Sequence, residues 1–171
     1  MSRAFVRESD FPSLPDLPPV VSALPAGARN YLTAGGAQRL RDELARLHTM
    51  ERPRLASAPL DDTDAKRELQ VLDQRIRTLQ ESLRTAEIPA LTPGLAETVR
   101  FGTTVTVREA GGIETNYRIV GVDEIDLDRN WVSWLSPLAR ALQNARRGET
   151  VTLKTPRGAR ELQIVDIICE P

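Results

Sequence analysis

Apolar residues recur along positions 37–86 with the spacing of two packed helices. In the second half of this stretch they follow one another at intervals of three and four residues: Leu69, Leu72, Ile76, Leu79, Leu83 and Ala86. The first half repeats this spacing in Ala37, Leu40, Leu44 and Leu47. A row of this kind is typical of a helix that packs against one partner helix. The pattern therefore predicts an antiparallel helical hairpin, or coiled coil, over residues 31–87.

The two rows also predict where the hairpin turns. In an antiparallel arrangement the facing pairs are Leu40 with Leu83, Leu44 with Leu79, and Leu47 with Ile76. The centre of these pairs falls at Asp61 and Asp62, beside Pro59 and Thr63, which are turn and helix N-cap residue types. Pro53 has no backbone N–H, so we expect it to bend the first helix.

Beyond the hairpin the apolar period changes from helical to alternating. Residues 88–98 carry two prolines and a glycine and are expected to form a linker. Residues 99–171 alternate apolar and polar positions, which predicts strands at 104–108, 113–119, 131–135, 151–154 and 159–168. A short helix is predicted at 137–145. The predicted fold class is α+β, a helical hairpin followed by an antiparallel sheet with one short helix.

The composition of the chain indicates which cellular setting and which kinds of partner to expect. Its 171 residues carry a net charge of −1, so it is no polycation of the kind that coats duplex DNA. The single cysteine, Cys169, excludes an internal disulfide and is expected to be buried, which suits a reducing, cytoplasmic setting. No apolar run approaches the roughly 20 residues of a membrane span, so no membrane contact is expected. Residues 1–30, rich in proline, are expected to form a flexible tail.

Three aspartates at the predicted turn, Asp61, Asp62 and Asp64, form the candidate site. Acids at a helical turn most often cap a helix, where the helix dipole favours negative charge. Carboxylates at a narrow tip also suit Mg²⁺, which takes one or two protein oxygens and completes its shell with water and phosphate. Both interpretations stay open. Because two carboxylates alone bind such an ion weakly, no tightly bound cofactor is expected, and the tip would complete a metal site in a partner.

The arginines of the hairpin form a second candidate surface. They slightly outnumber the interspersed acids and include Arg75 and Arg77. A basic shaft can follow a single strand of nucleic acid, although ordinary ion pairs between helices explain the arginines equally well. His48 is the one histidine and has no cysteine beside it, so neither a metal-ligand set nor a nucleophilic triad is supported.

Several separated motifs follow one another along residues 31–168. The hairpin contributes Tyr31-Leu32-Thr33 with Gly36, Glu51-Arg52-Pro53, and the stretch 69–79. The second domain contributes Phe101-Gly102, Tyr117–Gly121 followed by Asp123 and Glu124, Ser136–Leu142, and Thr155-Pro156 with Gly158. In this order the motifs resemble the Gre family of bacterial transcription elongation factors, GreA and GreB.

The resemblance implies a coiled coil that enters the secondary channel of RNA polymerase and a domain of FKBP-like fold, residues 99–171, that docks on the channel rim. In the family, two acids at the tip help to hold the catalytic Mg²⁺, and the active site of the polymerase then cleaves backtracked RNA. The chain is thus expected to be no enzyme by itself and to act as a monomer. Its expected partner is core RNA polymerase, with nascent RNA as a candidate contact of Arg75 and Arg77.

The resemblance carries over to particular residues. Asp61 and Asp64 match the family's tip spacing, with aspartate in place of glutamate, and Asp62 is an additional candidate. Lys66 and its neighbours supply neither the asparagine nor the tyrosine that follow in the family. The docking candidates are Ser136, Pro137, Ala139 and Arg140.

The hairpin is expected to be shorter than that of GreB. About a dozen residues fewer between Pro53 and Leu69 correspond to about 9 Å of reach at 1.5 Å per residue. Polymerase binding is therefore better supported than stimulation of RNA cleavage. A regulator that occupies the channel without cleavage stays open, as do a prolyl isomerase domain and a hairpin that pairs between chains.

Overall fold

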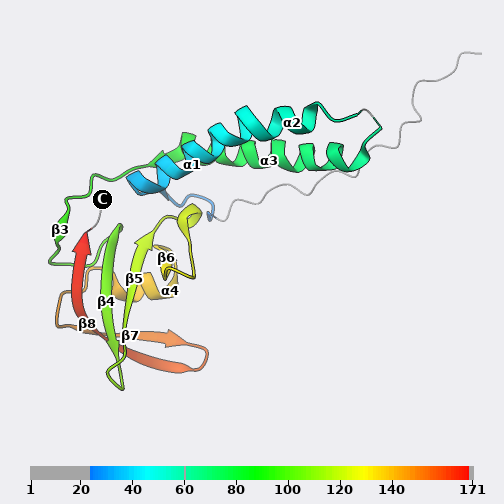
Figure 1. Cartoon of the computed structure of the whole chain (residues 1–171). Helices are drawn as coiled ribbons and strands as arrows, with labels where there is room; N and C mark the ends of the chain where they lie inside the picture. The colour runs from blue at the N-terminus through cyan, green and yellow to red at the C-terminus, as the bar shows by residue number, and fades with distance from the viewer. Residues whose placement is uncertain (1–23, 60, 170–171) are drawn as a thin grey trace, which may run out of the picture.

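A long helical hairpin projects from a small sheet domain in the computed structural model, which describes residues 24–59 and 61–169 (Figure 1). The hairpin, here termed the arm, consists of α1 (Ala34–Arg46), η1 (Leu47–Glu51), α2 (Arg52–Ala56) and the returning α3 (Thr63–Thr85). The predicted α+β class and the helical hairpin are confirmed. Of the expected flexible tail, residues 1–23 lie outside the described part of the chain.

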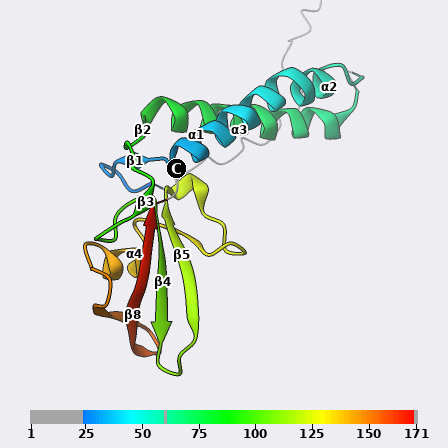
Figure 2. The same cartoon turned by 60° about the vertical axis from the view of Figure 1, so that its left-hand side comes forward.

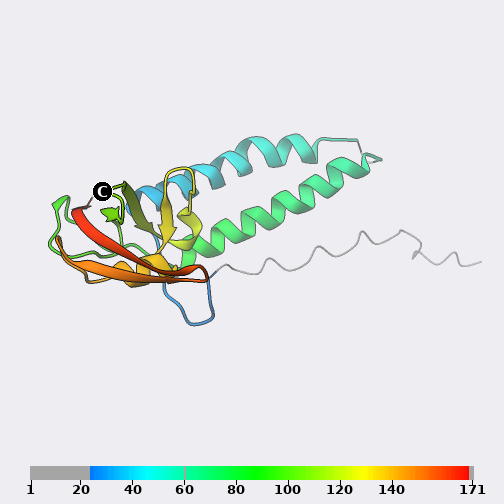
Figure 3. The same cartoon turned by 90° about the horizontal axis from the view of Figure 1, so that it is seen from below.

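A continuous apolar seam joins the two halves of the arm. Its buried members are Leu32, Ala37, Leu40, Leu47, Leu55, Leu72, Ile76 and Leu79, with Leu44, Leu69, Leu83 and Ala86 packed half-buried against them. Viewed from below, the outgoing and returning helices run side by side (Figure 3). The rows that predicted the hairpin therefore supply its core.

The outgoing helix widens just before Pro53. Over Leu47–Glu51 it forms a π turn, and the backbone N–H of Arg52 donates to the carbonyl of Leu47, five residues earlier. In an α-helix the ring of Pro53 would crowd the carbonyl of Thr49 and leave it without a backbone donor. The wider turn accommodates the proline, which then stands in the first turn of α2. The distortion expected at Pro53 is thus a π turn in the five residues Leu47–Glu51.

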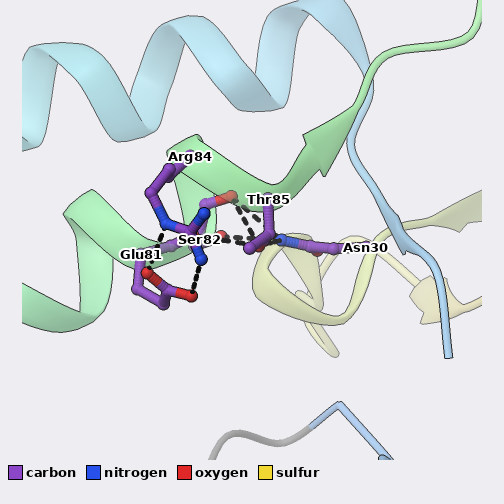
Figure 4. A network of polar contacts seen from close by, with 5 residues as sticks. All are labelled: Asn30, Glu81, Ser82, Arg84 and Thr85. Atoms are coloured by element: carbon purple, nitrogen blue, oxygen red, sulfur yellow. Dashed lines mark hydrogen bonds and ion pairs between the residues drawn. The ribbon is translucent and has the colours of Figure 1, made fainter. Parts of the chain in front are cut away.

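The foot of the arm is closed by a two-stranded parallel sheet. It pairs β1 (Asn30–Tyr31) with β2 (Ala86–Glu87). The side-chain amide of Asn30 donates to the carbonyl of Ser82 at 2.9 Å and to the hydroxyl of Thr85 at 3.0 Å, both in the last turn of α3 (Figure 4). These bonds satisfy carbonyl and hydroxyl groups at the end of the helix and hold the entering chain against it.

The sheet domain orders its strands as β3-β8-β4-β5-β6, with β7 paired to β8. The elements are β3 (Gly94–Leu95), β4 (Thr103–Glu109), β5 (Glu114–Val120), η2 (Val122–Glu124), β6 (Trp131–Ser133), α4 (Pro137–Leu142), β7 (Thr150–Thr155) and β8 (Gly158–Cys169). Two predictions need correction. The β5–β6 pair is parallel, because residues 121–130 carry the chain back before β6 begins. Part of the expected linker 88–98 forms β3, which pairs with β8.

The sheet domain has a core separate from that of the arm. Its buried apolar residues are Val99, Val105, Val107, Ile119, Ala139, Leu142, Ala145, Leu162, Ile164 and Ile167. Two of them belong to α4, so this helix covers one face of the sheet (Figure 1). Cys169 is buried at the end of β8, as predicted. Within the described residues, no helix is long and apolar enough to cross a membrane.

Candidate functional site

The three aspartates lie at the far end of the arm and are all exposed. This end, residues 57–59 and 61–62 with the first turn of α3, is here termed the tip. Asp62 is the N-cap of α3, and its Oδ1 accepts from the backbone N–H of Ala65 at 2.9 Å. Asp64 stands in the first turn of the same helix, where the dipole favours a negative charge. The capping interpretation therefore holds for Asp62. Among residues 24–59 and 61–169, the carboxylates of Asp61 and Asp64 have no hydrogen-bond partner.

The tip fits a metal ion only as part of a larger site. Among residues 24–59 and 61–169, no group of three or more acidic, histidine or cysteine side chains is arranged to hold a metal. Mg²⁺ needs near-octahedral coordination and is commonly held by one or two carboxylates with water and phosphate oxygens. Asp61 and Asp64 could supply those carboxylates, and the remaining ligands would have to come from outside this chain.

The arm arginines differ in their freedom to bind nucleic acid. Arg75 is held by Glu43 of α1, with Nε–Oε1 at 3.0 Å and Nη2–Oε2 at 3.1 Å. Arg52 is likewise paired with Asp73. In contrast, Arg77 is exposed and has no ion pair in the part of the chain that the structure describes. Of the two candidate RNA contacts, Arg75 thus already links the two halves of the arm, and Arg77 is available.

The docking segment, Ser136–Arg140, forms the start of α4. The hydroxyl of Ser136 accepts from the backbone N–H of Ala139 at 3.1 Å and caps the helix. Pro137 and Arg140 are exposed, whereas Ala139 is only 2% exposed and belongs to the core of the sheet domain. The side chain of Ala139 therefore has no surface through which to contact a partner, because it points into the sheet.

A buried carboxylate between the arm and the sheet domain is a feature that the sequence argument missed. Glu124, in η2, accepts hydrogen bonds from the backbone N–H of Thr33 at 2.8 Å and from its hydroxyl at 2.5 Å. These partners lie 91 positions apart, beyond the reach of any local pattern. The adjacent glycines at the start of α1 were the available signal, since a Cβ on Gly36 would lie 2.0 Å from Oε1 of Glu124.

An aromatic-lined cavity of about 400 Å³ lies between the foot of the arm and the sheet domain. Tyr31, Phe101 and Trp134 line it together with Arg29, Pro89, Arg100, Ile119, Ala139 and Gln143. The ring of Tyr31 packs with its centroid 5.4 Å from that of Phe101 and 5.1 Å from that of Trp134. Because Tyr31 belongs to β1 at the foot of the arm, the aromatic lining of this cavity joins the foot of the arm to the sheet domain.

Comparison with known proteins places the chain among transcription factors. A family model described as "Transcription elongation factor, GreA/GreB, C-term" matches residues 94–168. A transcription elongation factor GreB of Neisseria meningitidis serogroup A is 39% identical over 154 residues, covering 81% of this chain and 93% of that protein. A transcription elongation factor GreA of Alkalilimnicola ehrlichii is 37% identical, covering 80% and 95%. The solved structure of GreA factor homolog 1 of Thermus thermophilus is 27% identical, with a TM-score of 0.38, and covers 82% and 99%.

The alignment with the GreB relative also bears on length and family. It extends over 154 positions, whereas 81% of 171 residues is about 139, so about fifteen aligned positions have no counterpart here. This difference has the size expected for a shortened arm.

The relatives are named as elongation factors, in agreement with the expectation that the chain is no enzyme by itself. The chain belongs to the GreA/GreB family of transcription elongation factors.

Proposed function

We propose that this chain is an elongation factor that docks on RNA polymerase through its sheet domain and inserts its arm into the secondary channel. The observation that carries the proposal is the projecting arm, which keeps an exposed acidic tip away from the sheet domain and from α4 (Figure 1). The 23 residues of α3 correspond to a shaft of roughly 35 Å. Its buried apolar seam and its ion pairs between helices make this shaft stiff enough to hold the tip at a distance.

A short arm favours occupancy of the channel over strong stimulation of RNA cleavage. Cleavage requires a carboxylate to reach the ion in the active site, and catalytic geometry tolerates errors of about 1 Å. Asp62 is engaged in capping, so Asp61 and Asp64 are the two carboxylates left for that task. A shaft shortened by about 9 Å places them short of a position that the longer relatives reach.

Neutralising the tip tests which of these two activities the arm has. When the chain is added to a stalled, backtracked polymerase complex, we expect elongation to change and only a small fraction of the transcripts to be cleaved. Any cleavage should be lost in Asp61→Asn with Asp64→Asn, because the amides cannot replace two anionic ligands of Mg²⁺. Transcript length is measured on sequencing gels over time, with binding measured in parallel.

Asp62→Asn is the matched control for the tip experiment. Asparagine caps helices as well as aspartate does, so this variant removes one charge from the tip and keeps α3 intact. It should behave like the unaltered chain. Rapid cleavage that survives loss of both Asp61 and Asp64 would exclude a tip-held ion, and absence of polymerase binding by the unaltered chain would refute the proposed function itself.

A further inference from the structure

Both helices of the arm are attached to one short turn of the sheet domain. This turn, η2, follows β5 and lies against the start of α1 (Figure 2). From the α1 side, Thr33 and Arg39 bind Glu124. From the α3 side, the hydroxyl of Ser82 donates a hydrogen bond to Asp123. Consecutive side chains of one turn thus hold the outgoing and the returning helix.

Glu124 uses the whole hydrogen-bonding capacity of its carboxylate at this junction. Oε1 accepts from the Thr33 hydroxyl and from Nη2 of Arg39 at 3.2 Å, and Oε2 accepts from the backbone N–H groups of Thr33 and Gly121, the latter at 3.1 Å. Its side chain is 1% exposed. A buried carboxylate is costly unless it is fully paired, and removing part of such a network leaves charged or polar groups unsatisfied. The network therefore favours one orientation of the arm.

The backbones at the junction are too close for ordinary side chains. A Cβ on Gly36 would lie 2.0 Å from Oε1 of Glu124, and a Cβ on Gly121 would lie 2.1 Å from the carbonyl oxygen of Tyr31. Contacts this short do not occur in folded proteins. A Cβ on Gly121 meets backbone and would force the arm and the sheet domain apart, whereas a Cβ on Gly36 would displace the Glu124 carboxylate from its network. By contrast, a Cβ on Gly35 would meet nothing closer than Nη1 of Arg39 at 3.5 Å.

Arg39 extends the junction toward the docking segment. While one of its nitrogens pairs with Glu124, its guanidinium carbon lies 4.9 Å from the ring centroid of Trp131. Trp131 opens β6, and the chain then runs directly into the segment that begins α4. A cation over an aromatic ring is a directional contact, so Arg39 ties α1 to the strand that precedes the docking segment.

We propose that Glu124 is a positioning residue that fixes the angle at which the arm leaves the sheet domain, and so decides where the tip arrives inside the polymerase. This inference rests on the proposed function for its consequence, although the angle itself is a property of the free chain. A rotation of about 5° at the foot of a shaft about 35 Å long moves its end by about 3 Å. A displacement of this size changes which part of the channel the tip reaches.

The free chain tests the angle directly. Spin labels on Arg67→Cys near the tip and Thr152→Cys on β7, in a chain carrying Cys169→Ser, report the distance between arm and sheet domain. The Glu124 parent is expected to give one narrow distance distribution. Glu124→Gln and Gly36→Ala should each give a broader or displaced distribution, because one loses the paired charge and the other fills the space that Oε1 occupies. Gly35→Ala, the same substitution one residue earlier, should match the parent.

The polymerase complex tests the consequence. Glu124→Gln should bind core polymerase within about twofold of the unaltered chain. It should lose about tenfold or more of the effect on elongation of stalled complexes that depends on where the tip lies, here termed the tip effect, because the docking surface is unchanged and the arm is misdirected. Thr33→Ser keeps the hydroxyl donor, so this variant should match the parent in both polymerase binding and tip effect. A general weakening of the fold would instead reduce binding and tip effect together.

The two experiments separate failure of this inference from failure of the proposed function. Parent-like distance distributions in both Glu124→Gln and Gly36→Ala, with circular dichroism showing folded chains, would overturn the positioning role. Equal losses of binding and tip effect in Glu124→Gln would overturn it as well. A parent chain that fails to bind polymerase contradicts the proposed function, while the spin-label distances still decide the role of Glu124 at the junction.

Discussion

Two carboxylates introduced on the exposed surface of α4 are expected to remove polymerase binding almost completely. Pro137 and Arg140 are the exposed members of the docking segment, and the proposal assigns the contact with the channel rim to them. In Pro137→Glu with Arg140→Glu, an apolar ring and a cation are both replaced by carboxylates. We expect affinity for core polymerase to fall about 30-fold or more, about 2 kcal/mol, as at a binding hot spot. Fluorescence anisotropy of a labelled chain measures it.

The double substitution leaves α4 able to form. At position 137, the first position of α4, glutamate is favoured by the helix dipole, and Ser136 keeps its capping bond to Ala139. Position 140 lies in the last turn and is exposed, so glutamate there is accommodated at a small cost. Pro156→Glu with Arg157→Glu, on the exposed turn between β7 and β8, makes the same charge change of three units away from the docking segment and should bind nearly as the parent does. If the folded double variant binds polymerase with the affinity of the parent, α4 is not the docking surface.

Truncation of Leu79 should destabilise the arm more than any exposed change. This side chain is 2% exposed at the centre of the apolar seam, and Leu→Ala at such sites costs about 3 kcal/mol from lost burial and the cavity left behind. Val71, on the same helix, is 52% exposed, so Val71→Ala should change stability by about 0.5 kcal/mol or less. Urea titrations followed by circular dichroism compare the two variants.

The same variant shows whether arm and sheet domain unfold separately. Both tryptophans of the chain lie in the sheet domain, where Trp131 contacts Arg39 and Trp134 contacts Tyr31. Their fluorescence therefore reports the sheet domain and its junction with the arm, while the helical dichroism reports mainly the arm. In Leu79→Ala the dichroism transition should move to lower urea than the fluorescence transition, since the two cores are distinct. Transitions that shift together by the same amount would show that the junction couples both cores into one cooperative unit.

The arm was predictable because its signal is local. Leucines at intervals of three and four residues define one helix face, and the two rows had to face each other for their apolar surfaces to be buried. The short helix at 137 was predictable for the same reason, from a serine cap followed by proline, although it ends at Leu142 and not at residue 145. Caps and periodicity concern neighbours within a few residues, which a single sequence displays.

The junction could not be predicted because its contacts join distant segments. Glu124 meets Thr33 across 91 positions, and Tyr31 meets Trp134 across the same divide between arm and sheet domain. The parallel pairing of β6 was missed for a related reason: alternation predicts a strand but not its direction. At the tip, the sequence located the three aspartates and left their role open, and the structure assigned a capping bond to Asp62 alone.

A structure of this chain bound to a backtracked RNA polymerase complex is the most direct test of the central claim. The account predicts that α4 lies on the rim of the secondary channel, that the arm runs inside the channel, and that the carboxylates of Asp61 and Asp64 stop several ångströms short of the catalytic Mg²⁺. An arm that lies outside the channel, or a sheet domain held to the polymerase by a face other than α4, would contradict it.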